Sequence, residues 1–181
     1  EDRLKLQDVE IESFGAINYV NGVAKALAKK MLSGTIQEYV IVHDTDMDGT
    51  VGGALMHRIF QRFLDAQHAH LPSVAHRLRV CPLTSGRDFE EGIEAFIASW
   101  PQDVERVIVI VDHAIRPKLF QQLQAYGSLF LVDHHTPTKE LDTVLDWEKM
   151  EFVITESSCS TMKAYQLSLA LIDQLLDADY S

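Results

Sequence analysis

Three short hydrophobic runs in this sequence each end in a cluster of acidic and histidine residues. The runs cover residues 39–42, 107–111 and 129–132 and are rich in Val, Ile and Leu. Short β-branched runs bounded by polar residues are typical of buried strands in a parallel sheet. Because parallel strands end at the same edge of a sheet, where α/β proteins bind their ligands, we expect the three clusters to meet in one crevice.

The three clusters would bring five aspartates and up to four histidines into that crevice. Carboxylates at this density repel one another unless cations neutralise them, which favours a metal site. Oxygen ligands with one or two imidazoles suit Mn²⁺, with Mg²⁺ or Co²⁺ as alternatives. Two such ions, expected in the complete protein, would polarise a phosphoryl oxygen and activate water. The clusters are His43-Asp44-Thr45-Asp46-Met47-Asp48-Gly49, Asp112-His113 and Asp133-His134-His135.

Predicted strands and helices alternate along the chain. This order favours a parallel sheet with right-handed crossovers. We therefore expect α/β architecture, with three α/β/α layers around a mainly parallel central sheet, in a single domain over residues 1–181. The expected strands are 38–43, 77–81, 106–111 and 128–132, and the expected helices are 17–32, 50–65, 89–97, 117–126 and 158–176.

Apolar spacing predicts the buried face of two of these helices. Helix 50–65 should face inward with Val51, Leu55, Ile59 and Phe63. The last helix should face inward with Met162, Tyr165, Leu169, Ile172 and Leu176. Residues 68–73, between the second helix and the second strand, are expected to form a loop.

Charge and composition limit the partners. The formal net charge is −11, and the few basic residues form no stripe that could grip long nucleic acid. Apolar runs are too short to span a membrane, and no segment resembles a signal peptide, so we expect a cytoplasmic protein. A disulfide between Cys81 and Cys159 is not expected. A homodimer is compatible with the sequence.

Other interpretations of the polar residues are weaker. An Asp-x-Asp-x-Asp-Gly run also opens a calcium-binding EF-hand loop, but position 12 of that loop would be Leu55 instead of Glu. A zinc site at His68, His70 and His76 lacks supporting ligands, so a solvated loop is favoured. Thr50, at a helix N-terminus, and Arg87 are expected to contact substrate phosphate, with ordinary surface placement as the alternative for Arg87.

The ordered set of Asp44-x-Asp46-x-Asp48-Gly49, Asp112-His113 and Asp133-His134-His135 resembles motifs I, II and III of the DHH phosphoesterases. That superfamily includes RecJ exonucleases, nanoRNases of the NrnA and NrnB kinds, cyclic-dinucleotide phosphodiesterases and family II inorganic pyrophosphatases. The resemblance covers roughly residues 38–176. Its later part is most similar to NrnB-like and phage-type members.

The resemblance implies a role for each motif residue. It places metal ligands at Asp46, Asp48, Asp112 and His134, with Asp112 as the bridge between two ions. Asp44 is the expected further ligand, and His43 is expected to lie next to the ligands without contacting the metal. His135 would contact phosphate or act as a general acid, and Asp133 would orient His134.

The resemblance also implies a function: hydrolysis of phosphodiester bonds in short single-stranded oligonucleotides or small nucleotides. An inorganic pyrophosphatase or polyphosphatase, and a non-catalytic binding module of the same fold, are the alternatives. Family members carry a fourth Asp motif and a C-terminal DHH-associated domain, and neither is recognised in this chain. We therefore expect the chain to be a catalytic domain that is truncated at its C-terminus.

Overall fold

The computed structural model describes residues 20–70, 76–84, 87–136, 140, 144, 151–154 and 158–179. Within them, five strands form one sheet: β1 (Glu38–His43), β2 (Arg77–Pro82), β3 (Arg106–Val111), β4 (Ser128–Asp133) and β5 (Phe152–Ile154). Their order across the sheet is β2-β1-β3-β4-β5, and every neighbouring pair is parallel.

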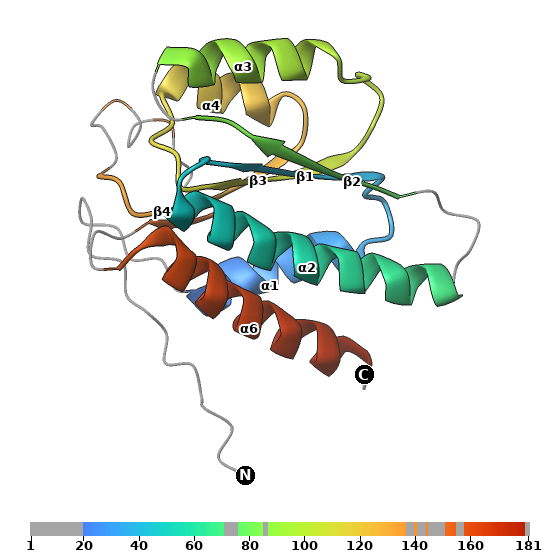
Figure 1. Cartoon of the computed structure of the whole chain (residues 1–181). Coiled ribbons are helices and arrows are strands. Elements are labelled where there is room, and N and C mark those ends of the chain that lie inside the picture. The colour runs from blue at the N-terminus through green and yellow to red at the C-terminus, as the bar shows by residue number, and fades with distance from the viewer. Residues whose placement is uncertain are drawn as a thin grey trace.

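Helices cover both faces of this sheet. Figure 1 shows α1 (Val20–Leu32), α2 (Met47–His70) and α6 (Ser160–Asp179) on one face, with α3 (Arg87–Ala98) and α4 (Pro117–Gln124) on the other. The expected three-layer α/β/α fold with a parallel sheet is confirmed.

The central strands are buried because each of their faces supplies one of two hydrophobic cores. All six residues of β1 and of β3 are buried. Successive residues point to opposite faces of a strand, so Tyr39 and Ile41 join the core under α1, α2 and α6, whereas Val40 and Val42 join the core under α3 and α4. A sheet packed on both sides holds the ends of its strands in fixed positions.

Some elements differ from their predicted bounds. Helix α2 begins at Met47 and continues to His70, so residues 68–70 are helical and do not form the expected loop. The helix therefore begins inside the acidic run, which excludes an EF-hand loop there. Strand β5 was not predicted, because three apolar residues are too few to show a period. Residues 71–75 lie outside the described part.

The zinc alternative gains no support. His76 directs its Nδ1 at the main-chain oxygen of Ile36, 2.8 Å away, and so has a structural partner. The side chains of His68 and His70 lie outside the described part of the chain.

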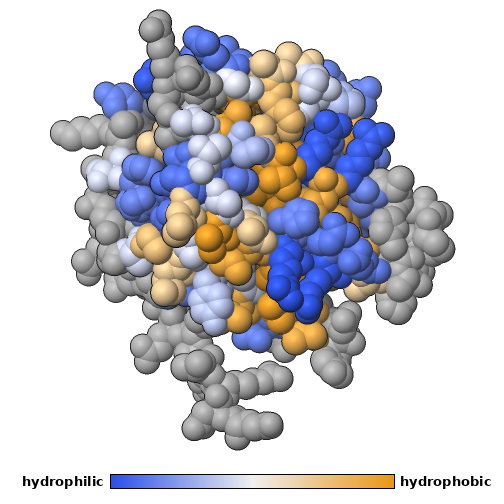
Figure 2. Space-filling model, viewed as in Figure 1, coloured by the Kyte–Doolittle hydropathy of each residue, from blue (hydrophilic) through white to orange (hydrophobic). Residues whose placement is uncertain are grey.

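The predicted inward face of α6 is wrong, and that of α2 is right in part, because Leu55, Ile59 and Phe63 pack against the core as expected. On α6 the buried apolar residues are Ala164, Leu167, Ala170 and Leu171, whereas four of the five residues that we expected inside are exposed: Met162, Tyr165, Ile172 and Leu176. On α2 the fully buried side chains include Met56 and Phe60, and Val51 is 42% exposed. Figure 2, viewed as in Figure 1, shows apolar residues exposed between hydrophilic areas of the surface.

Polar residues on the buried side of α6 explain this error. Ser160, Lys163 and Ser168 are all buried, and a pattern argument assigns such residues to solvent. On α2 the helix approaches the sheet closely at Gly52, where a Cβ atom would lie 2.7 Å from Val111 Cγ1. The fully buried side chains Met56 and Phe60 continue this row at intervals of four residues.

A buried ion cluster closes the amino-terminal edge of the sheet. The carboxylate of Glu38 accepts hydrogen bonds from both Arg79 and Arg106, which lie on the two strands that flank β1. Arg106 also donates to the Pro101 main-chain oxygen at 2.8 Å, and its guanidinium lies 5.1 Å from the ring centroid of Trp100. The charge of Glu38 is therefore matched within the protein at this edge.

Two smaller expectations concern cysteines and membranes. Cys81 and Cys159 are both free, as predicted. Among the described helices, none combines the length and the apolar character that a membrane crossing requires.

The revised face of α6 can be tested with two neighbouring residues of similar size. Leu171→Ala should lower the free energy of unfolding by about 2–5 kcal/mol, because it removes a fully buried side chain and leaves a cavity. Ile172→Ala, at a site that is 41% exposed, should cost about 1 kcal/mol or less. Urea unfolding followed by circular dichroism measures both. Equal losses, or a larger loss at Ile172, would contradict the observed face.

Candidate metal centre

The parallel register brings the ends of β1, β3 and β4 together. His43 pairs with Val111, and Val111 pairs with Val132. The main chain continues this alignment one residue further, because Asp44 N donates to the Val111 oxygen at 3.2 Å and Asp112 N donates to the Val132 oxygen at 2.9 Å. The three sequence clusters therefore lie at one edge of the sheet.

Asp112 is the central residue of this edge. Its side-chain oxygens belong to two groups of three residues whose candidate ligand atoms all lie within 4.8 Å of one another. One group is Asp112, His134 and His135, and the other is Asp44, Asp46 and Asp112. A carboxylate shared by two such groups is the arrangement expected of a ligand that bridges two cations.

The backbone of Asp112 is strained. Its φ of 63° is the only positive φ at a non-glycine residue in the described chain. Left-handed backbone is uncommon for residues with a side chain, and it persists where the surrounding structure enforces it, often at functional sites. Here it turns the chain at the end of β3 and leaves the carboxylate 2% exposed.

The electrostatics of Asp112 fit a bound cation. Burial raises its pKa, and the charges of Asp48 and Asp46 raise it further, against the lowering effect of a hydrogen bond from Ser160. A divalent ion would offset the repulsion that makes this carboxylate hard to ionise. The donor set of carboxylate oxygens and imidazole nitrogens also suits Mn²⁺, so the residues present fit the cation that the sequence implies.

The turn between β1 and α2 shapes the first motif. Gly49 N donates to Asp46 Oδ1 at 2.8 Å, and Thr45 N donates to Asp44 Oδ1 at 2.6 Å. A Cβ atom at Gly49 would lie 2.6 Å from the main-chain oxygen of Asp44. Only glycine therefore allows the turn to close so tightly that Asp44 and Asp46 face the same crevice.

Two of the four histidines at this edge point elsewhere. His43 is buried, and its Nδ1 lies 2.7 Å from the main-chain oxygen of Asp44. Its ring packs against Gly53, where an added Cβ atom would lie 2.7 Å from the His43 ring carbons. Burial lowers the pKa of His113 to about 4, so that imidazole is neutral at pH 7. Neither residue belongs to the two ligand groups.

Asp48 lies in neither ligand group because it caps α6. Its Oδ2 accepts from Ser160 N and its Oδ1 accepts from Thr161 N, both at 2.8 Å, and Thr161 Oγ1 donates to the Asp48 main-chain oxygen at the same distance. Burial raises the pKa of Asp48, but these hydrogen bonds outweigh it and leave the pKa below its usual value. Asp48 Oδ2 is still 3.9 Å from His134 Nε2.

The first turn of α6 contributes residues that sequence analysis did not assign. Ser160 Oγ donates to Asp112 Oδ1 at 2.8 Å. Lys163 is fully buried, and its ammonium donates to the main-chain oxygen of Ser158. Burial lowers the pKa of Lys163 to about 8, against the opposing effect of the charge on Asp133. The available signal was a run of small hydroxyl residues, Ser158, Ser160 and Thr161, at the start of a helix.

The histidine pair lies just beyond β4. His134 Nε2 is 3.2 Å from Asp112 Oδ1, and the His134 and His135 ring centroids are 4.6 Å apart. Asp133 Oδ1 accepts from the main-chain N–H of His134 and from His135 Nδ1, at 2.8 and 2.7 Å. Asp133 therefore contacts the main chain of His134 and also holds the ring of His135, and its expected role in orienting His134 stays a prediction. The hydrogen bond between Asp133 and His135 raises the pKa of His135, although burial acts in the opposite direction.

The expected substrate contacts are only partly described. Thr50 is exposed in the first turn of α2, where its N–H donates to the Asp46 main-chain oxygen at 3.0 Å. Arg87 begins α3, but its side chain lies outside the described part.

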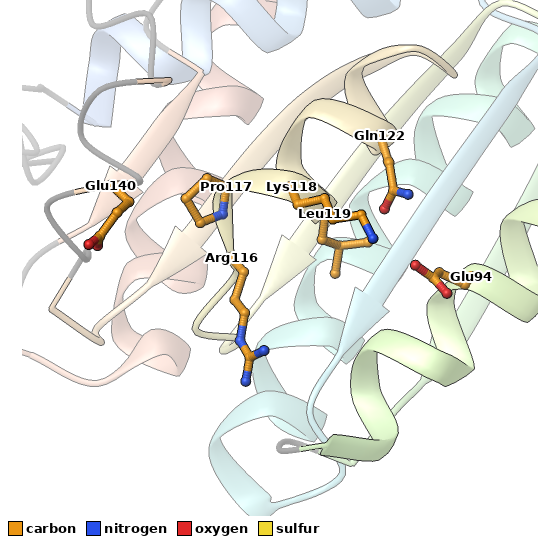
Figure 3. Close-up of a pocket in the computed structure, with 7 residues that line it drawn as sticks. All are labelled: Glu94, Arg116, Pro117, Lys118, Leu119, Gln122 and Glu140. Carbon is orange, nitrogen blue, oxygen red and sulfur yellow. The ribbon is translucent and has the colours of Figure 1, made fainter.

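Sequence analysis did not name Arg116, a cation that lies nearer to Asp112 along the chain than Arg87 does. Arg116, at the N-cap of α4, is exposed and four residues from Asp112, a stretch that spans at most about 14 Å. Figure 3 shows it beside a cavity of about 510 Å³ that α3 and α4 share with Glu140. The Arg116-Pro117 pair, typical of a helix start, was the available signal.

Comparisons with known proteins identify the family of this architecture. A model of the DHH family, N-terminal domain, matches residues 38–178. No curated protein sequence matches the chain significantly.

Solved structures agree in fold. RecJ from Thermus thermophilus in complex with Mn²⁺ is 18% identical, with a TM-score of 0.59 over 95% of this chain and 22% of RecJ. An exonuclease RecJ bound to manganese is 20% identical, with a TM-score of 0.57 over 87% and 38%. The DHH domain of a protein assigned to a family of ribosomal proteins is 15% identical, with a TM-score of 0.58 over 83% and 39%. This chain thus spans well under half of each, and the likeness concerns the fold.

Removal of the Ser160 hydroxyl tests how the α6 turn supports Asp112. Ser160→Ala should weaken Mn²⁺ binding by about 10–100-fold, because groups that orient a metal ligand typically contribute that much. The matched control is Ser168→Ala, a buried serine on the same helix whose Oγ donates to Met56 Sδ at 3.9 Å. Isothermal titration calorimetry measures both. Equal Mn²⁺ affinity in the two variants would show that Ser160 does not position Asp112.

Proposed function

This chain belongs to the DHH family, and from that premise we propose that it is a divalent-metal-dependent phosphoesterase that hydrolyses short oligonucleotides or small nucleotides. The observation that carries the proposal is the position of Asp112 in two adjacent ligand groups. Bound divalent ions would supply Lewis-acid polarisation of a phosphoryl oxygen and activation of a water molecule.

We propose Mn²⁺ as the cation, held by Asp112 with His134 on one side and with Asp44 and Asp46 on the other. Mixed oxygen and nitrogen ligands support this choice over Mg²⁺, which prefers oxygen alone. The two RecJ proteins are described as bound to manganese. Asp48 lies next to these residues, and the family resemblance implies that it is also a ligand. Its hydrogen bonds to α6 already engage both of its oxygens.

His135 is the proposed general acid. Its hydrogen bond to Asp133 fixes the ring and raises its pKa, so the imidazolium persists closer to neutral pH than in a free histidine. An acid with a pKa near the working pH protonates a leaving oxygen efficiently. In this scheme Asp133 acts through His135 and does not touch the substrate.

The charge of the chain supports a short substrate. With a formal net charge of −11, the protein offers no extended attraction for a long polyanion. Cations near the proposed site are few: bound metal would contact the scissile phosphate, and we propose that Arg116 and Lys118, which line the cavity at the start of α4, meet a neighbouring phosphate. A substrate of one to a few nucleotides matches that supply of positive charge.

A substrate panel tests the proposal. The complete protein that contains this chain is incubated with Mn²⁺ and short RNA, short DNA, cyclic dinucleotides, 3′,5′-bisphosphorylated adenosine or pyrophosphate. We expect cleavage of a phosphodiester, lost with a chelator and in Asp112→Asn, but kept in the control Asp173→Asn, which alters an exposed aspartate on α6. Cleavage of pyrophosphate alone would favour the pyrophosphatase alternative. Nucleotide binding without turnover would favour a non-catalytic module.

The two adjacent histidines should separate metal binding from chemistry. His135→Ala should lower kcat by about 10²–10⁴-fold, as expected for loss of a general acid, while its Mn²⁺ affinity changes little. His134→Ala should mainly weaken Mn²⁺ binding, because His134 Nε2 is the nitrogen next to Asp112. Single-turnover rates at saturating Mn²⁺, combined with calorimetric titration, distinguish the two effects. An equal loss of Mn²⁺ affinity in both variants would make His135 a ligand and remove it as the acid.

A further inference from the structure

The proposed reaction gives no role to Lys163, although this residue has the least expected environment in the site. Its side chain is fully buried on α6. Lysine is almost never fully buried unless its charge is paired. Here the ammonium donates to the main-chain oxygen of Ser158 and lies 3.3 Å from its Oγ, both neutral acceptors. Among the described residues, it forms no ion pair with a carboxylate.

The charges that act on Lys163 come from the metal centre at longer range. Burial lowers its pKa, and the carboxylates of Asp133, Asp48 and Asp112 act in the opposite sense. Interaction between charges is reciprocal. The ammonium therefore stabilises these three carboxylates as anions by the same amount by which they stabilise it as a cation.

Lys163 lies on the helix whose first turn contacts two of the proposed ligands. It lies three residues after Ser160, which donates to Asp112 and, through its N–H, to Asp48. Ser158, the acceptor of the ammonium, immediately precedes the same helical turn. The N–H groups of that turn offset carboxylate charge by direct contact with Asp48, and the ammonium offsets it at longer range.

We propose that Lys163 is a built-in counter-cation of the metal centre, which keeps the carboxylates together when no metal is bound and thereby sets a lower metal affinity. This inference rests on the metal centre of the proposed function. A fixed positive charge near the site repels an incoming divalent ion, so loss of that charge should tighten metal binding. At protein distances and dielectric, one unit charge acting on a divalent ion changes the dissociation constant by about tenfold or more.

A purely structural role for Lys163 predicts the opposite sign. If the side chain only pins Ser158, its removal loosens the turn that holds Asp48 and Asp112. The ligands would then be less well oriented, and metal would bind more weakly. The direction of the change in affinity therefore separates the two roles.

The experiment titrates Mn²⁺ into the full chain and its variants by calorimetry, and measures the rise in Tm that Mn²⁺ causes. Lys163→Gln removes the charge but keeps a donor for the Ser158 oxygen. We expect a Kd for Mn²⁺ about tenfold lower or more, and a larger Mn²⁺-induced rise in Tm. Lys163→Arg keeps the charge and should bind like the wild type. The matched control, Lys29→Gln, removes an exposed lysine from α1 and should also leave Kd unchanged.

The outcomes are distinct. Unchanged or weaker Mn²⁺ binding by Lys163→Gln, with normal binding by the wild type, overturns the counter-cation role alone. Failure of the wild type to bind Mn²⁺ overturns the metal centre of the proposed function, and this inference with it. If Lys163→Gln does not fold, Lys163→Met, of similar shape and without charge, is titrated in the same way and must show the same tightening.

Discussion

The carboxylate of Asp112 has to remain charged in a buried position, next to other carboxylates, and the rest of the site is organised around that requirement. Positive φ at Asp112 directs the side chain into the crevice. The hydroxyl of Ser160 and the side chain of His134 contact this carboxylate at 2.8 and 3.2 Å. Each of these contacts reduces the repulsion only in part. The remaining imbalance is the physical reason that this edge suits a cation.

The two edges of the sheet handle buried charge differently. At the amino-terminal edge, Glu38 is matched by two arginines, so its charge is balanced inside the protein. At the carboxyl-terminal edge, the cation supplied from within the fold is Lys163, at longer range, together with the helix N-terminus that Asp48 caps. The first arrangement holds β1, β2 and β3 in register. The arrangement at the carboxyl-terminal edge leaves net negative charge where a cation can reach it.

The two ligand groups around Asp112 also differ in chemistry. Asp44 and Asp46 offer oxygen alone, whereas His134, the proposed ligand in the other group, offers nitrogen. Oxygen-only sites suit hard ions such as Mg²⁺, and imidazole shifts preference toward Mn²⁺ or Co²⁺. Two positions with unequal preferences can fill at different concentrations of one ion. The hydrogen bond from Ser160 on α6, which orients Asp112, would then matter most at the metal position with the lower affinity. A ligand that is already oriented loses less free energy when the ion binds.

Four of the five described strands, their parallel arrangement and the edge at which the candidate ligands meet could be predicted from the sequence. These features depend on local periodicity and on where each run ends, both of which are visible in one dimension. Only the tertiary structure decided which side of α6 is buried, and therefore that Ser160 and Lys163 reach the site. Helix α6 is apolar on more than one side, and its inner face carries polar residues whose partners lie far away in sequence, such as Asp48 and Asp112. Likewise, Asp133 contacts the ring of His135, because the chain turns beyond β4 and side-chain direction no longer follows strand alternation.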